Sequence, residues 1–518
     1  MPASDAMIDD QGDVIAFLSD PASYDPRPAN VQRIETHGAQ VFLTDGDVFK
    51  IKRAVRYPYL DFSTLEKRHT ACARELEINS PNAPKIYKRL AAITREADGR
   101  LAFDGRGDVV EWAVQMARFR EGDVLANRIA HSPLTIEEAK SLADAVYVSH
   151  CQAAVIAKPP REASTANIAA DVLTALPSLF APPDQPAIQA LATRLTALVA
   201  DVQPLLTHRA SEGHVRRCHG DLHLANIVLL DGAPTLFDAI EFDETLATTD
   251  TLYDLAFLLM DLDKRGQRPT ANVVLNRYLW RTQDISDIEG LAALPVFLAL
   301  RAAIRAMVGA QKAALASDEL TEPRSYLVRA ATYLRESVPA LVIVGGLSGS
   351  GKSTLAAALA PCLGRAPGAV HLRSDLERKA LFKAQEFDRL PEAAYSEHAT
   401  AAVYQLMLRK AQSALRAGYC VIADAVHAYP SERAAMAAVA EGMGARLHTF
   451  WLEAPREILL ERVANRKNDA SDATPQVVER QMSYDLGQVE WTRLDASGPL
   501  EETLRTALSY LHASIGPP

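Results

Sequence analysis

A glycine-rich segment at Gly346–Ser353 has the residue types and the spacing of a phosphate-binding loop. Its sequence GLSGSGKS fits the pattern G-x-x-x-x-G-K-[ST], and it stands between an apolar run and a helix-permissive run. Glycines let backbone N–H groups point at phosphate oxygens, the lysine reaches the β- and γ-phosphates, and the next hydroxyl can ligate Mg²⁺. We therefore predict an ATP or GTP site, with Mg²⁺ on Ser353, formed by Gly346, Ser348, Gly349, Ser350, Gly351, Lys352, Ser353 and Thr354.

Two aspartates follow strand-like runs in the same part of the chain. Asp375 comes shortly after Ala369–Leu372, and Asp424 directly follows Val421–Ala423. Open α/β sheets bind their ligands at the carboxyl ends of the strands, where both side chains should lie. Asp375 is predicted to orient an acceptor hydroxyl or to cap a helix, and the two roles are compatible. Asp424 is predicted to hold Mg²⁺ as a Walker-B-like carboxylate or to contact substrate, with helix capping as the alternative.

Arg462 and Arg466 stand four residues apart, so a helix through them would place both on one face. Arginines placed in this way can close over ATP and neutralise the charge of the transferring phosphoryl group. Ordinary surface exposure is the equal alternative for two arginines taken alone. We assign both residues a catalytic role.

A second group of residues with chemical potential lies in Cys218–Asn226, which contains the pattern H-G-D-x-x-x-x-N. Asp238 follows the asparagine after an apolar stretch. This spacing has a mechanical interpretation: Asp221 accepts or orients the proton of an acceptor hydroxyl, while Asn226 and Asp238 hold Mg²⁺ on the phosphates. His219 is expected to support the loop rather than to react.

The elements that must position these residues change character near residue 335. Before it, two strand-like runs flank an Asp-Gly hairpin signal at Thr44–Asp47, and alanine- and leucine-rich helical segments follow. After it, strands and helices alternate, which is the pattern of a parallel sheet with right-handed crossovers. We predict an α+β domain over residues 1–335, with a small antiparallel sheet and a helical lobe, followed by an α/β P-loop domain over residues 340–518.

Composition limits the partners and the compartment. The formal net charge is −10, and a duplex-binding surface is normally basic, so nucleic acid is not expected as a partner. The five cysteines are scattered without a CxxC pair, which argues against a disulfide framework or a zinc site and indicates a reducing compartment. The N-terminus lacks an apolar core, and no stretch reaches about 18 uncharged apolar residues. A cytoplasmic protein without membrane attachment is expected, and its oligomeric state has no signal in the sequence.

The segment 340–518 as a whole resembles the small-molecule kinases of the gluconate-kinase and zeta-toxin or chloramphenicol-phosphotransferase type. Asp375 matches the acceptor-side aspartate of that group, and Arg462 and Arg466 match its lid arginines. The resemblance implies phosphotransfer and leaves the acceptor open.

The H-G-D segment, with its asparagine and downstream aspartate, resembles the aminoglycoside phosphotransferase and choline kinase superfamily, in which glycine stands where protein kinases have arginine. The resemblance implies that Val48–Lys52 carries the ATP-binding lysine and that Glu75 is its ion-pair partner. Lys50 and Lys52 share a strand face, and Lys50 is favoured because it fits the family's apolar-x-Lys pattern.

Three further segments bear on this resemblance. Asp250 and Asp254 match the aspartates that brace the catalytic loop of the superfamily. Thr36–Gln40, which should cover the phosphates, has a single glycine and no G-x-G-x-x-G. Arg53–Phe62 and Glu241–Asp243 extend the resemblance, over nearly the whole chain, to a bacterial group of phosphotransferase-like proteins fused to a P-loop kinase.

Together the motifs predict an ATP-dependent, Mg²⁺-dependent kinase with two nucleotide sites that moves the γ-phosphoryl group to hydroxyl groups of small molecules. In one alternative, one domain is a nucleotide-loaded regulatory module and only the other is catalytic, which the imperfect phosphate loop favours for the first domain. In another, the P-loop domain is a polynucleotide 5′-kinase, which its near balance of acidic and basic residues disfavours. The identity of the acceptor cannot be read from fold.

Overall fold

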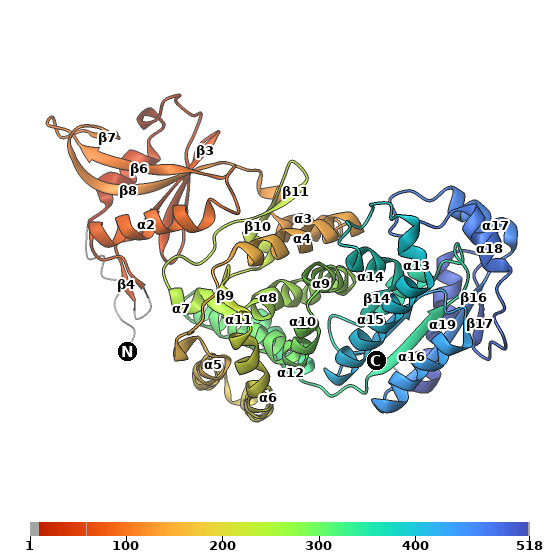
Figure 1. The fold of residues 1–518 in the computed structure, drawn as a ribbon. Helices are drawn as coiled ribbons and strands as arrows, with labels where there is room; N and C mark the ends of the chain where they lie inside the picture. The colour runs from red at the N-terminus through yellow and green to blue at the C-terminus, as the bar shows by residue number, and fades with distance from the viewer. Residues whose placement is uncertain (1–9, 58–59, 317, 516–518) are drawn as a thin grey trace. The chain divides into compact units, whose positions relative to one another are not determined.

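The computed structural model of the chain folds into two compact units, each described here by itself (Figure 1). The described residues are 10–57, 60–316 and 318–515. The first unit comprises residues 1–164 and 210–258, and the second comprises residues 165–209 and 259–518. The predicted domain boundary near residue 335 stays a prediction.

The first unit contains a six-stranded antiparallel sheet with the strand order β1-β2-β3-β8-β6-β7. Its strands are β1 (Gln32–Glu35), β2 (Ala39–Leu43), β3 (Asp47–Lys52), β6 (Tyr87–Arg95), β7 (Leu101–Phe103) and β8 (Asp108–Ala117). Helix α2 (Leu65–Asn79) packs against β8, β6 and β3. Because side chains alternate along a strand, Phe49 and Ile51 enter a core on one face while Lys50 and Lys52 face α2.

The rest of the first unit carries the H-G-D segment between short strands. Its other elements are α1 (Gly12–Ser19), β4 (Arg56–Tyr57), β5 (Leu60–Asp61), α3 (Leu125–His131), α4 (Ile136–Gln152), β9 (Val215–Arg217), β10 (Ile227–Leu230), β11 (Ala233–Leu236), α7 (Glu244–Ala247) and β12 (Thr248–Asp250). Strand β9 pairs with β12, and β10 pairs with β11 as a hairpin. These pairings hold the H-G-D loop at one end and bring Asp238 back after β11. Helix α8 (Thr251–Lys264) begins in the first unit and ends in the second.

The second unit contains a helical part and a parallel sheet. The helices of the former are α5 (Thr165–Leu179), α6 (Gln185–Ser211), α9 (Arg268–Thr282), α10 (Ile285–Gly290), α11 (Leu294–Ala316) and α12 (Thr321–Tyr333). Helix α11 packs against α12 and α5. The stretch Ile285–Ala314 is long and apolar enough to cross a bilayer, but 72% of its most apolar window is buried inside the protein, as in a core helix of a water-soluble fold. Nothing in the described residues points to a membrane, and the cytoplasmic location stays a prediction.

The parallel sheet of the second unit has five strands in the order β14-β15-β13-β16-β17. They are β13 (Ala340–Gly345), β14 (Val370–Arg373), β15 (Val421–Asp424), β16 (Arg446–Glu453) and β17 (Thr492–Asp495). The accompanying helices are α13 (Lys352–Leu359), α14 (Ser374–Leu381), α15 (Glu397–Arg416), α16 (Pro430–Gly442), α17 (Arg456–Ala464), α18 (Pro475–Met482) and α19 (Leu500–Ile515). An aliphatic core lies between the sheet and helices α13 and α19. The predicted fold class, an antiparallel kinase-like part followed by a parallel P-loop part, is confirmed.

Candidate functional sites

The phosphate loop joins the end of β13 to the start of α13. Gly346, Gly349 and Gly351 have φ angles of 138°, 87° and 88°, which L-residues with side chains rarely adopt. A Cβ atom on Gly346 would stand 2.6 Å from Leu452 O, and one on Gly349 would stand 2.6 Å from Leu459 O. The loop therefore requires these glycines for its backbone path, as the sequence predicted for a loop that wraps around phosphates.

Lys352 opens helix α13 and is half-buried at this loop. Its Nζ donates to Leu347 O at 2.9 Å, within the same loop. Burial lowers the pKa of Lys352 to about 8, although Asp424 and Asp375 act to raise it. The hydroxyl of Ser350 is buried without a hydrogen-bond partner among the described residues, while Ser348 N donates to Gln481 Oε1 at 2.8 Å. A half-buried lysine and an unpaired hydroxyl beside left-handed glycines fit a bound polyphosphate.

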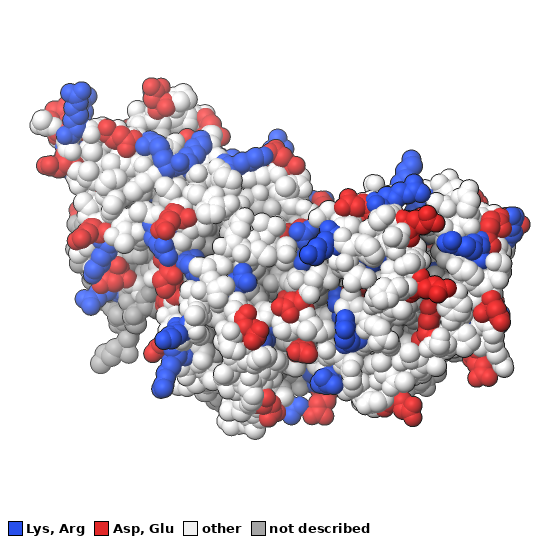
Figure 2. All heavy atoms as spheres, in the orientation of Figure 1, with Lys and Arg blue, Asp and Glu red and all other residues white. Residues whose placement is uncertain are grey.

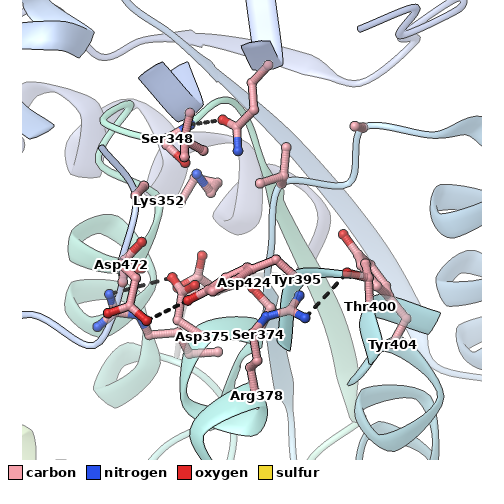
Figure 3. Close-up of a pocket in the computed structure, with 18 of the residues that line it drawn as sticks. Ser348, Lys352, Ser374, Asp375, Arg378, Tyr395, Thr400, Tyr404, Asp424 and Asp472 are labelled. Carbon is pink, nitrogen blue, oxygen red and sulfur yellow. Dashed lines mark hydrogen bonds and ion pairs between the residues drawn. The ribbon is translucent and has the colours of Figure 1, made fainter. Parts of the chain in front are cut away.

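Asp424 ends β15 beside Lys352 (Figure 3). Its side chain is 2% exposed, and His371 Nε2 on the neighbouring strand β14 donates to its Oδ2 at 3.3 Å. Burial would raise the pKa of Asp424, but His371, Arg373 and Lys352 together lower it to about 2. The carboxylate is therefore ionised at neutral pH, and a buried anion at this position fits a Mg²⁺ ion held jointly with Ser353.

Asp375 lies in the first turn of α14 and lines the same cavity as Asp424. The N-cap of α14 is Arg373, which has no side-chain capping bond, so Asp375 is not the N-cap residue of this helix. Its Oδ2 stands 3.9 Å from the guanidinium of Arg373. The carboxylate is thus available to an acceptor hydroxyl in the cavity.

The two predicted lid arginines come from the end of α17. Arg462 lies in the helix, and its guanidinium stands 3.5 Å from Gly349 O and 3.4 Å from Ser497 O. Arg466 follows the helix end, and its guanidinium stands 3.9 Å from Asp469. Both side chains line the cavity, although the expectation that one helix carries both is wrong because α17 ends at Ala464.

These groups surround one cavity of about 1650 Å³. Ligand sites for drug-sized molecules typically span about 300–1,000 Å³, so a nucleotide and a small acceptor can be held together. Its lining includes the phosphate loop, both aspartates and both arginines: Ser348, Gly349, Gly351, Lys352, Ser353, Thr354, Asp375, Asp424, Arg462 and Arg466. The structure therefore brings together almost all of the site residues predicted in this half of the chain.

The acceptor side of the cavity contains residues that sequence analysis missed (Figure 3). Arg378 NH1 donates to Ala394 O at 2.6 Å, and its guanidinium stands 5.0 Å from the centre of the Tyr395 ring. Tyr395 OH donates to Asp472 at 2.6 Å, and Lys379 Nζ donates to the same carboxylate at 2.9 Å. Arg378 stands three residues after Asp375, a helical spacing that places both near one face. The spacing was therefore a usable signal for Arg378, whereas Asp472 is far away in sequence.

In the first unit, the H-G-D loop brings Asp221 and Asn226 into contact. Asn226 Nδ2 donates to Asp221 O and to Asp221 Oδ2, both at 3.0 Å, and His223 Nε2 stands 3.3 Å from the same Oδ2. The side chain of Asp221 is 42% exposed, so an acceptor can reach it. This geometry fits a carboxylate held in place to receive a hydroxyl proton.

The loop is braced from below by Asp254 of α8. His219 N and Gly220 N donate to its carboxylate at 3.3 and 2.9 Å. His219 Nε2 donates to Phe237 O at 3.0 Å, and burial lowers the pKa of His219, so the neutral ring supports the loop as predicted. Asp250 accepts from Leu252 N at 2.8 Å at the start of α8.

The two candidate lysines of β3 share one glutamate. Lys50 Nζ donates to Glu75 Oε1 at 2.8 Å and to Asp238 Oδ1 at 2.7 Å. Lys52 Nζ donates to Glu75 Oε2 at 2.6 Å and also to Glu241. Although burial acts to lower it, the pKa of Lys50 is raised well above its ordinary value by Asp238 and Glu75. Lys50 is the lysine next to the predicted metal residue, and Lys52 is a buried second cation that sequence alone left as an alternative.

The segment that should cover the phosphates of the first site is a tight turn. Thr36 N donates to Ala39 O at 2.9 Å, and only Thr36, His37 and Gly38 connect the strands β1 and β2. The guanidinium of Arg53 donates to Thr36 O at 3.1 Å and to His37 O at 3.2 Å. The turn is therefore hydrogen-bonded to the residue that follows β3, and it does not form a glycine-rich loop that could cover the phosphates.

Figure 2 shows basic and acidic side chains interspersed over the face in view, without a broad basic patch among the residues described there. Counterion-displacing surfaces for duplexes gather Lys and Arg on one face.

The fold and these two constellations define an enzyme of the kinase class, with a phosphotransferase-type part and a P-loop part. Residues 66–294 match the family model described as "Phosphotransferase enzyme family", and residues 341–484 match the model described as "AAA domain".

Curated relatives match nearly the whole length of the chain. Uncharacterized proteins of Mycobacterium tuberculosis and Mycobacterium bovis are 29% identical over 495 residues, covering 93% of this chain and 95% of theirs. Among solved structures, a gluconokinase from Sinorhizobium meliloti 1021 is 21% identical over 35% of this chain and 95% of its own, with a TM-score of 0.26. A choline/ethanolamine kinase family protein from Mesorhizobium loti is 12% identical over 62% of this chain and 95% of its own, with a TM-score of 0.39.

Proposed function

We propose that the chain is an ATP-dependent phosphotransferase with two nucleotide sites, each of which moves the γ-phosphoryl group of ATP to a hydroxyl group of a small molecule. The observation that carries the proposal is the cavity of the second unit. It combines a glycine loop, the half-buried ammonium of Lys352, the ionised Asp424 and the partly exposed carboxylate of Asp375 around one space. These are the parts that phosphoryl transfer requires, since the chemistry is chiefly positioning and charge stabilisation.

In the second unit each residue takes one part of the reaction. The loop N–H groups and Lys352 bind the β- and γ-phosphates, and Ser353 and Asp424 hold Mg²⁺, which neutralises phosphate charge when it is bound. Asp375 orients the acceptor hydroxyl for in-line attack and accepts its proton. Arg462 and Arg466 line the cavity near the phosphate loop and stabilise the charge of the transferring group.

In the first unit Asp221 orients the acceptor hydroxyl, and Asn226 and Asp238 hold Mg²⁺. Lys50, paired with Glu75, binds the phosphates of ATP. Lys52 fixes the second oxygen of Glu75 and so keeps helix α2 in register with β3.

A second candidate function applies to the first unit alone, namely a nucleotide-holding module without transfer activity. The pinned turn at His37–Gly38 favours it, because no flexible glycine loop is present there to close over the γ-phosphate.

An ATP-consumption screen over sugars, amino sugars, nucleosides and antibiotics tests both candidates. It is run with the unaltered chain, with Lys352→Ala and with Asp238→Asn. Two enzyme sites predict that each variant loses a different set of acceptors. If Asp238→Asn loses no acceptor, the first unit is a module; if Lys352→Ala loses none, the P-loop assignment is wrong.

A further inference from the structure

Strand β14 forms one edge of the parallel sheet in the second unit. Val370 N donates to Cys420 O at 2.9 Å, toward the neighbouring strand β15. Since backbone groups alternate along a strand, Ala369 O and His371 N point the opposite way, to the outer edge. An edge strand leaves such groups in need of partners.

Helix α9 supplies those partners through the carboxamide of Asn276. Asn276 Nδ2 donates to Ala369 O at 3.2 Å, and His371 N donates to Asn276 Oδ1 at 2.8 Å. This pair of bonds, one given and one received two residues apart, is what a residue of a neighbouring parallel strand would make. The orientation of the amide is fixed, because Nδ2 also donates to Asn272 O at 3.1 Å. Asn276 thus replaces one residue of a sixth strand.

Other contacts hold α9 along the same edge (Figure 1). Asn272 Nδ2, one helical turn earlier, donates to Ala369 O at 3.1 Å. Arg268 donates to Gly364 O at 2.9 Å ahead of β14, and Trp280 Nε1 donates to Leu376 O at 3.0 Å beyond it. The helix therefore follows β14 from the loop before the strand to the first turn of α14.

His371, whose backbone N–H donates to Asn276, also contacts the phosphate site. The ring of His371 donates to the carboxylate of Asp424 at 3.3 Å. The side chain of His371 is 14% exposed, so solvent does not readily replace this contact. A two-residue step along the chain leads from His371 to Arg373, and Asp375 follows at the start of α14.

We propose that Asn276 is a positioning residue of the P-loop site, which sets the height and register of β14 and, through His371, the orientation of the metal-binding carboxylate of Asp424. The inference rests on the proposed function of the second unit. It makes a helix that precedes the P-loop segment in the chain part of the apparatus for Mg²⁺-dependent nucleotide binding.

The test measures ATP affinity by calorimetry on the full chain, with Mg²⁺ and with EDTA, in an Asp238→Asn background that silences metal-dependent binding at the first site. Asn276→Leu removes both edge bonds, and we expect the gain in affinity that Mg²⁺ gives to fall about 3- to 10-fold, as for one or two lost hydrogen bonds. Affinity in EDTA should stay unchanged. Asn276→Asp keeps an acceptor for His371 N but sets a carboxylate oxygen against Ala369 O and Asn272 O, so it should lose at least as much.

Arg268→Ala is the matched control, because it removes one bond from the same helix to the same part of the unit without touching β14. It should lower the melting temperature without changing the effect of Mg²⁺. His371→Phe removes the ring contact to Asp424, and its loss should not add to that of Asn276→Leu, since both act through one path.

Three results would contradict the inference. Asn276→Leu with the same metal effect as Arg268→Ala would leave Asn276 a packing residue only. If the losses of the Mg²⁺ effect in Asn276→Leu and His371→Phe were fully additive, Asn276 would not act on Asp424 through His371. Should Asn276→Leu not fold, an unchanged metal effect in both Asn276→Asp and His371→Phe would be equally decisive. By contrast, an absence of ATP binding in the Asp238→Asn background itself, with no thermal shift at millimolar Mg²⁺ and ATP, would overturn the proposed function and the inference with it.

Discussion

The two candidate sites differ in how they prepare for the charge of ATP. In the second unit the backbone itself binds phosphate, through three glycines in left-handed conformations, and among the described residues Lys352 donates a hydrogen bond only to a carbonyl oxygen of its own loop. In the first unit the corresponding turn at His37–Gly38 is short and is hydrogen-bonded to Arg53. Lys50 there forms ion pairs with the carboxylates of Glu75 and Asp238. Among the described residues, Lys352 of the second site has no carboxylate within ion-pair distance. Lys50 of the first site must give up a carboxylate before it can bind a phosphate oxygen.

This difference has a mechanistic consequence. Asp238 and Lys50 form an ion pair in the first unit, and both are assigned to the same Mg·ATP complex. A metal ion that binds Asp238 withdraws it from Lys50, which then becomes available to a phosphate oxygen. Metal and nucleotide should therefore assist one another strongly at the first site, while the second site can bind phosphate before it binds metal.

A large effect is expected from Lys352→Ala, measured in the Asp238→Asn background. Removal of the only cation that the phosphate loop itself contributes should reduce ATP consumption at the second site by roughly 10²–10³-fold or more. The fold should persist, because Lys352 faces the cavity. Residual turnover within tenfold of the parent, measured on protein with an unchanged circular dichroism spectrum, would show that the loop is not a nucleotide site.

The second prediction separates two roles within the first unit and is measured in the Lys352→Ala background. Asp221→Asn should retain affinity for Mg·ATP and lose transfer by about 10²–10⁴-fold, the usual contribution of acid–base help. Asp238→Asn should instead weaken metal-dependent ATP binding. Isosteric amides preserve the size of each side chain, so the contrast tests charge and not packing. Equal behaviour of the two variants would contradict the assignment.

The third prediction concerns the lid arginines of the second unit. Arg462→Ala or Arg466→Ala should lower kcat by about 10–100-fold and change the affinity for ATP much less, because a cation directed at transition-state charge acts selectively there. Arg456→Ala is the control, since that arginine lies on the same helix α17 and forms an exposed ion pair with Glu479. Parallel losses in affinity and kcat would show that the pair only anchors ATP.

Site residues could be predicted from the sequence where they belong to one contiguous motif, and could not where they come together from distant segments. The phosphate loop and the H-G-D segment are contiguous motifs, so their residues and their carboxyl-end positions followed directly from spacing. The ion pair of Lys50 with Glu75 also followed from a motif, whereas the second pair, Lys52 with Glu241, depends on the fold bringing β3 to a distant loop.

Contacts between segments on the two sides of the predicted boundary near residue 335 could not be predicted from residue spacing. Asn272 and Asn276 look like ordinary polar residues of a helix, and nothing in their spacing shows that they complete the edge of a sheet whose strand lies 95 to 97 residues downstream. Contacts of this kind between distant segments depend on tertiary packing, which single-sequence patterns do not encode. The same reason explains why Asp472 was missed on the acceptor side of the cavity.

The smallest expected effect is a difference in pH dependence, and it contrasts the two lysines directly. Lys352 has a pKa lowered to about 8 by burial, so in the free protein its amine is mostly charged at pH 7 and mostly neutral at pH 9. The pKa of Lys50 is raised well above its ordinary value by Asp238 and Glu75, so this amine stays charged over the same range.

Phosphate binds the charged amine, and a bound anion raises the pKa of Lys352 further. Affinity at the second site should therefore be almost fully present at pH 7 and fall as pH rises through about 8, by about tenfold between pH 7 and pH 9, because the charged fraction of one amine falls by that factor. Affinity at the first site should stay level over that interval. Calorimetric titration of ATP in the Asp238→Asn and Lys352→Ala backgrounds measures the two sites separately. If the second site holds a constant affinity to pH 9, its lysine does not have the lowered pKa that distinguishes it from Lys50 of the first site.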